Sequence, residues 1–171
     1  MPEKFSIDID DARFMTYAMA ILGGIAAISV IWVLTLAAAQ HAGETWARVG
    51  LMVIFPAVVG ELLKLIGLVI VGAKQSGWVT SKLDGAAAGA LAGLSFGIAI
   101  ASFSYVAGTA RAEQLAPLTM HVLTSAVGGL GIYYATSRKY WVAIALIVGA
   151  IGIHLAWNAV AVQVNRIEFL M

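Results

Sequence analysis

The sequence predicts an all-α integral membrane protein, a bundle of five transmembrane helices with its N-terminus in the cytoplasm. Of the 171 residues, 61% are hydrophobic and 11% are charged, with a mean hydropathy of +0.94. So little polar surface excludes a soluble domain of this size. The apolar residues gather into five long segments, and the joins between them are too short to hold another domain.

Each apolar segment is long enough, at about 1.5 Å per residue, to cross a hydrocarbon core of about 30 Å as a helix. A polar N-terminal segment at 1–13 precedes them, and a short C-terminal tail at 163–171 follows. Residues 14–162 are expected to form one transmembrane domain. Its expected helices span residues 14–39, 49–71, 83–108, 117–136 and 140–162.

The segment ends carry signals typical of membrane helices. Arg13 stands directly before the first segment, and Arg48 directly before the second. Pro117 opens the fourth, a favourable position for starting a helix. Tyr140 and Trp141 open the fifth, where interfacial aromatic residues are expected.

The third segment carries a glycine ladder, in which one glycine follows another every four residues. Residues four apart differ by about 40° around a helix, so the ladder forms a smooth groove. Small residues let helices approach closely in lipid. We expect the ladder to pack against another helix, of the same chain or of another one. Its members are Gly85, Gly89, Gly93 and Gly97.

The distribution of Lys and Arg sets the expected orientation. The side that holds the N-terminus carries six such residues near the helix ends, and the other side carries three. The positive-inside rule then places the N-terminus in the cytoplasm, in what we expect to be a prokaryotic cytoplasmic membrane. The six are Lys4, Arg13, Lys74, Lys82, Arg138 and Lys139; the three are Arg48, Arg111 and Arg166.

The overall charge and the cysteine count exclude several classes of function. A net charge of +1 does not indicate a nucleic-acid partner. The absence of cysteine excludes disulfides, thiolate metal sites and a cysteine nucleophile. The expected partners are the lipid bilayer and other membrane proteins, or a transmembrane protein substrate.

Glu61 lies near the centre of the second apolar segment. An ionisable side chain at that depth costs at least about 2.5 kcal/mol on insertion scales, so it points to a function. Lys64 follows three residues later, about 60° around the helix, where it can reach the carboxylate. We expect Glu61 and Lys64 to form a structural ion pair.

Four polar residues could meet inside the bundle: Glu61, His121, His154 and Asn158. In one chemistry, Glu61 activates a water as general base while the imidazoles or Asn158 stabilise an oxyanion. In another, Glu61 and the two histidines bind a divalent metal such as zinc that supplies the hydroxide. No cofactor is otherwise expected. Buried structural contacts and a transport path stay open as alternatives.

Four motifs, in order over about residues 50–160, resemble the PrsW-type intramembrane peptidases. Residues 60–64, GELLK, resemble that family's Glu-Glu-x-x-Lys motif, and residues 84–96 its Asp-Gly-x-x-x-Gly-x-x-x-Gly-x-x-Phe helix. Residues 117–131 resemble its next helix, which contains a histidine, and residues 154–158 its His-x-x-Trp-Asn motif. The resemblance implies a helical membrane fold and a peptidase that cuts membrane-anchored proteins.

The chain departs from the family pattern at two expected carboxylates. Gly60 replaces the first Glu of the pair, and Ile100 with Ala101 replaces a Glu-Asn pair in the third helix. If the base belongs at position 60, Glu61 would have to act from a helical face about 100° away. We therefore expect a non-catalytic relative, a pseudoenzyme that serves as scaffold or subunit of a membrane complex. An active peptidase using Glu61 and the histidines is the alternative, and a small-solute or proton transporter is the second.

Overall fold

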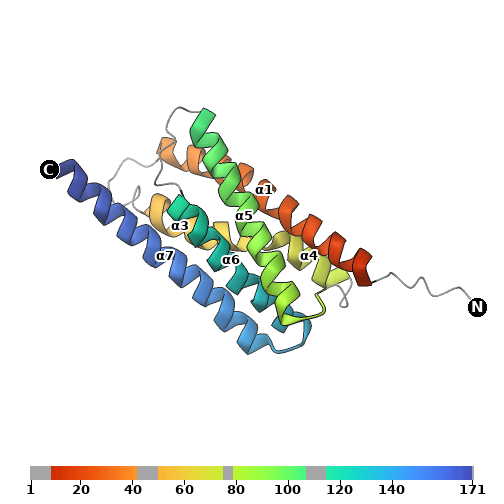
Figure 1. Cartoon of the computed structure of the whole chain (residues 1–171). Coiled ribbons are helices and arrows are strands. Elements are labelled where there is room, and N and C mark those ends of the chain that lie inside the picture. The colour runs from red at the N-terminus through yellow and green to blue at the C-terminus, as the bar shows by residue number, and fades with distance from the viewer. Residues whose placement is uncertain (1–8, 42–49, 75–78, 107–114, 171) are drawn as a thin grey trace, which may run out of the picture.

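A computed structural model describes residues 9–41, 50–74, 79–106 and 115–170, and these ranges contain helices and no strand. The all-α fold is thereby confirmed. Figure 1 shows the helices packed side by side in a slanted bundle. In chain order they are α1 (Ile9–His41), the π-helix η1 (Gly50–Ile54), α3 (Phe55–Lys64), α4 (Ile66–Lys74), α5 (Lys82–Val106), α6 (Leu115–Thr136) and α7 (Tyr140–Leu170).

Two helices are longer than the sequence analysis expected. α1 begins at Ile9 rather than at residue 14. Asp10 and Asp11 lie in its first turn, where negative side chains interact favourably with the positive end of the helix dipole. α7 continues to Leu170, so most of the expected tail at 163–171 is helical. No Gly or Pro follows Gly152, so nothing in the sequence interrupts that helix.

The second expected helix, 49–71, is divided into η1, α3 and α4. Pro56 stands in the first turn of α3, and Leu65 separates α3 from α4 with φ −83° and ψ −7°. The amide of Val69 donates to the carbonyl of Leu65 at 2.9 Å, so the path of the chain stays nearly continuous. π-Helical turns frequently accompany functional sites, and this one directly precedes the helix that carries Glu61.

Four helices in the described part of the chain are long and apolar enough to cross a membrane. α6 is helical but is not among them. A multi-pass membrane protein is therefore supported, whereas the expected count of five spans is not. The orientation also stays a prediction, since Lys4, Arg48 and Arg111 lie outside the described residues. The four spans are Asp10–Leu34, Phe55–Gly72, Lys82–Phe103 and Tyr140–Ala161.

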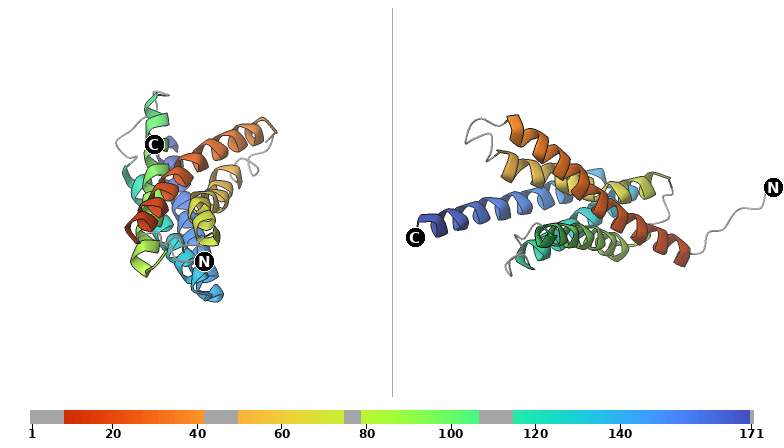
Figure 2. Two further views of the ribbon diagram at one scale, coloured as in Figure 1. Left: turned by 90° about the vertical axis from the view of Figure 1, so that its right-hand side faces the viewer. Right: turned by 90° about the horizontal axis from the view of Figure 1, so that it is seen from above.

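α3 holds the central position in the bundle. It contacts α1, α5, α6 and α7, whereas α5 packs chiefly between α1 and α6, and α6 packs against α7. In the two further views of Figure 2, α1 and α7 cross the bundle in different directions. A side chain that points inward from the middle of α3 is therefore surrounded by the other helices.

The glycine ladder of α5 faces α6 of the same chain. A Cβ added at Gly85, Gly89 or Gly93 would meet the carbonyl oxygens of Gly129, Ser125 and His121 respectively. At Gly97, the Cβ would instead meet the side chain of Leu118. This close approach fixes the height and rotation of α6 against α5, and with it the place of His121.

Candidate functional site

The Glu61 carboxylate lies at the centre of the bundle and has no exposed surface. Lys64, one turn later on α3, donates from Nζ to Glu61 Oε1 at 2.6 Å, and its side chain is also fully buried. The Lys64 ammonium also stands 5.1 Å from the centroid of the Phe96 ring, within cation–π range. Glu61 and Lys64 therefore form a compensated pair where lone charges would be costly.

α6 adds two hydroxyl groups to this carboxylate. Thr124 Oγ1 lies 2.7 Å from Glu61 Oε1, closer than its 3.0 Å to the carbonyl of Met120. Ser125 Oγ donates to Glu61 Oε2 at 3.4 Å. The sequence analysis assigned neither residue to the site. Their positions three and four residues after His121, on the same helical face, are the signal that could have found them.

Two histidines complete the cluster. His154, on α7, places Nδ1 2.7 Å from Glu61 Oε1. His121, on α6, packs edge-on against His154 with ring centroids 5.1 Å apart, and against Phe96 at 4.9 Å. His121 Nδ1 is buried and has no hydrogen-bond partner among the described residues. Such orphaned polar atoms are rare and call for an explanation.

The geometry of these three side chains fits a metal ion. One ligand atom from each of Glu61, His121 and His154 lies within 4.8 Å of the other two. Two imidazoles and a carboxylate are the ligand set of many catalytic zinc sites. Glu61 Oε1 already has three polar neighbours, so Oε2, with its single long contact to Ser125, is the less occupied oxygen. The unpartnered Nδ1 of His121 is a ligand atom without another role.

A family model described as "PrsW family intramembrane metalloprotease" matches residues 12–171, nearly the whole chain. The chain belongs to the PrsW family. This confirms the resemblance found in the sequence and the assignment as an integral membrane protein. No curated protein and no solved structure gives a match.

The PrsW-like residue Asn158 does not join the cluster around Glu61. Its side-chain amide donates to the carbonyl of Val53 in η1 at 3.1 Å. Asn158 thus connects α7 to the π-helical turn that precedes α3. The expected role of Asn158 in stabilising an oxyanion stays a prediction. In the structure, its hydrogen bond to Val53 positions α7 against η1.

The positions of the two missing PrsW carboxylates border an apolar cluster. A Cβ at Gly60 would lie 3.1 Å from Cδ1 of Ile31, on α1. Ile100 packs against the same cluster, which contains Ala27, Ile31 and Phe96. Of positions 60 and 61, which match the Glu-Glu of the family motif, it is Glu61 that lies beside His121 and His154. Whether Glu61 can take the role of a base expected at position 60 stays a prediction.

Proposed function

We propose that this PrsW-family protein is an intramembrane metallopeptidase whose metal is held by Glu61, His121 and His154. The observation that carries the proposal is the convergence of these three buried side chains, from three different helices, within 4.8 Å. The orphaned Nδ1 of His121 supports it, because metal coordination would give that atom a partner.

A divalent metal bound there would generate a hydroxide from water and polarise the scissile carbonyl. The rest of the work belongs to the side chains of the chain itself. Thr124 and Ser125 fix the orientation of the Glu61 carboxylate. The close pair of His154 Nδ1 and Glu61 Oε1 can hold a proton released during the reaction. Lys64 balances the carboxylate charge, and burial excludes bulk water.

A second candidate function is that of a non-catalytic scaffold or complex subunit. Lys64 already neutralises Glu61 at 2.6 Å, and neither side chain has exposed surface. A substrate would reach this site only after helices separate. The apolar residues at positions 60 and 100 are consistent with this candidate. The family match favours hydrolytic chemistry over transport.

Metal binding separates the two candidates. The full chain, purified in detergent and stripped with a chelator, would be titrated with Zn²⁺ and its bound metal counted. The peptidase proposal expects about one zinc per chain, with affinity at least tenfold weaker in Glu61→Gln. Asp11→Asn is the matched control, because it removes an exposed carboxylate at the start of α1. A folded wild-type chain that takes up no divalent metal would leave the scaffold as the better candidate.

We further propose that the N-terminus faces the cytoplasm of a prokaryotic cell, on the strength of the positive-inside count. The chain has no cysteine, so a single introduced thiol reports on its own position. Ser137→Cys, in the exposed turn between α6 and α7, should resist a membrane-impermeant thiol reagent in intact cells and react after lysis. Labelling in intact cells would reverse the assigned orientation.

A further inference from the structure

Three exposed basic residues meet at one end of the bundle. Lys82 is the first residue of α5, and Arg138 and Lys139 form the turn between α6 and α7. The Nζ atoms of Lys82 and Lys139 lie 5.8 Å and 6.0 Å from the centroid of the same Tyr134 ring. The ring therefore brings cations from two separate parts of the chain together.

The turn holds its two cations in a defined backbone conformation. The amide of Lys139 donates to the Tyr134 carbonyl at 2.8 Å, and that of Arg138 to the Ala135 carbonyl at 3.0 Å. Arg138 has φ 59°, the one positive φ of a non-glycine residue in the described ranges. Glycine or asparagine is the usual residue at such a helix end. Arg138 occupies that position here, and the two hydrogen bonds fix the direction in which the turn leaves α6.

No carboxylate in the described part of the chain neutralises this basic cluster of Lys82, Arg138 and Lys139. Asp84 is the nearest acidic residue in sequence, but its carboxylate is already engaged. It accepts hydrogen bonds from Thr80, Ser81 and Tyr17 and pairs with Arg13 Nε at 3.4 Å. Three unbalanced cations in close proximity attract an anion.

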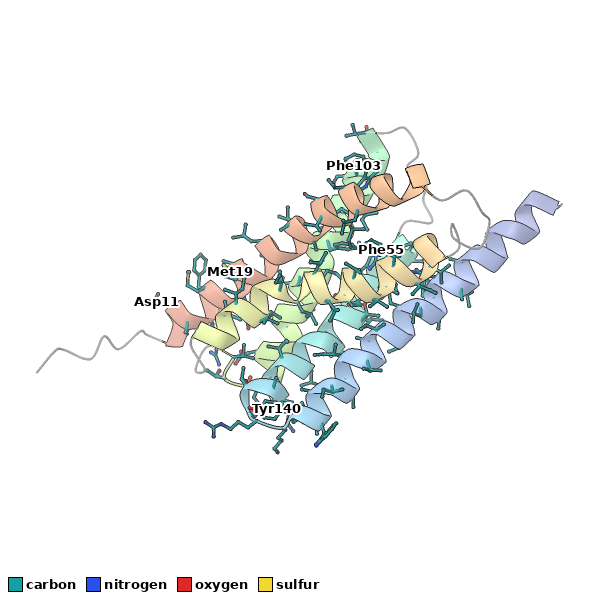
Figure 3. All side chains as sticks on the ribbon, turned by 180° about the vertical axis from the view of Figure 1, so that it is seen from behind. Asp11, Met19, Phe55, Phe103 and Tyr140 are labelled. Atoms are coloured by element: carbon teal, nitrogen blue, oxygen red, sulfur yellow. The ribbon has the colours of Figure 1, made fainter. Side chains whose placement is uncertain are left out.

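The surroundings of the basic cluster are those of a membrane interface. Tyr140 and Trp141, directly after the turn, are 59% and 85% exposed, and Leu83, beside Lys82, is 77% exposed. Figure 3 shows the labelled Tyr140 at the end of the bundle where α6 passes into α7, and Figure 1 shows α5 beginning at the same end. Aromatic residues at such positions lie at the level of the lipid headgroups.

We propose that the basic cluster binds the headgroup phosphate of an anionic phospholipid. Lys82, Arg138 and Lys139 supply the charge that attracts the phosphate. Leu83 and Trp141 offer apolar surface to the acyl chains, which a purely polar partner would leave uncovered. The same end is the one that the positive-inside count assigns to the anionic cytoplasmic leaflet. This proposal is independent of whether Glu61 binds a metal.

Native mass spectrometry of the full chain, titrated with phosphatidylglycerol or phosphatidylcholine, tests this site. The wild type should retain phosphatidylglycerol in preference to phosphatidylcholine. The variant Lys82→Gln/Arg138→Gly/Lys139→Gln should lose about fivefold in affinity per cation, on the order of a hundredfold in total. Glycine at 138 suits the positive φ, so the turn should persist. Lys82→Arg/Lys139→Arg should retain binding.

The control is the triple variant Arg48→Gln/Arg111→Gln/Arg166→Gln. It also removes three positive charges, but from the side that the positive-inside rule places away from the cytoplasm. It should keep the preference for phosphatidylglycerol. Equal loss in both triple variants, or loss in neither, would overturn the proposal. Tighter binding of a soluble poly-aspartate peptide than of phosphatidylglycerol would also overturn it, in favour of an acidic protein segment. If the triple variant does not fold, the single variant Lys139→Gln gives the same test, with an expected loss of about fivefold in affinity for phosphatidylglycerol.

Discussion

His154 Nδ1 lies 2.7 Å from Glu61 Oε1, although the two residues are 93 positions apart in the sequence. The contact joins α3 to α7 at the centre of the bundle, where both side chains are buried. The contact also orients the imidazole, because it places Nδ1 rather than Nε2 beside the carboxylate.

The first prediction concerns the Glu61–Lys64 pair. Lys64→Met keeps the length of the side chain but leaves the buried carboxylate without its counter-ion. We expect a loss of stability of about 3 to 5 kcal/mol, measured as a lower midpoint of thermal unfolding in detergent. Combining it with Glu61→Gln should recover most of the loss, because the uncompensated charge disappears. Full additivity of the two losses would show that the pair does not interact.

The second prediction concerns Thr124, which the sequence analysis did not assign. Thr124→Val keeps the shape and removes the hydroxyl that lies 2.7 Å from Glu61 Oε1. We expect a loss of about 1 to 3 kcal/mol in stability, together with weaker zinc binding. Thr136→Val is the control, because that hydroxyl contacts only the Tyr133 carbonyl within the described residues. Equal effects of the two variants on zinc affinity would remove Thr124 from the site.

Composition and hydrophobic pattern sufficed to predict the helical membrane fold, because a bilayer admits few ways of satisfying a buried backbone. Four ordered motifs sufficed for the family. The division of the second helix at Leu65 was not predicted, because Leu65 and its neighbours Lys64 and Ile66 are all residues found inside helices. The count of five spans stays a prediction, because four helices in the described part of the chain meet the length and hydropathy of a membrane span and α6 is not among them.

The candidate site was predicted in composition but not in geometry. Periodicity gives the rotation of a residue on its own helix, not which neighbouring helix that face meets. The orientation of Gly60 toward Ile31, and of Asn158 toward Val53, depends on how α1 and α7 cross α3. Those crossings are set by packing between segments that are distant in sequence, so no local pattern contains them.

The third prediction separates stability from metal binding at the two histidines. His121→Leu removes a buried nitrogen that has no partner, so the metal-free protein should be as stable as the wild type or more stable. The same variant should lose the stabilisation that zinc gives the wild type. His154→Leu should lower stability even without metal, because Glu61 then loses a close contact. Thermal unfolding with and without zinc measures both effects.

An intact zinc response in His121→Leu would exclude His121 as a ligand. A large loss of stability in the metal-free variant would instead show that the imidazole has a structural partner, in conflict with its unpaired Nδ1. Either result would weaken the peptidase proposal while leaving the anionic-lipid site untouched, because the two sites share no residue.

The last prediction tests the close approach of α5 and α6 that places His121. Gly89→Ala adds a methyl group that meets the carbonyl oxygen of Ser125, a backbone atom that cannot turn aside. We expect a loss of about 1 to 3 kcal/mol from overpacking, with reduced zinc affinity because α6 must shift and carry His121 with it. Gly149→Ala on α7 is the matched control, since its Cβ would meet nothing within 4 Å. That variant should unfold at the wild-type temperature or slightly above it, because alanine favours the helix. If Gly89→Ala lowered stability and left zinc affinity unchanged, the ladder would support the fold without positioning the site.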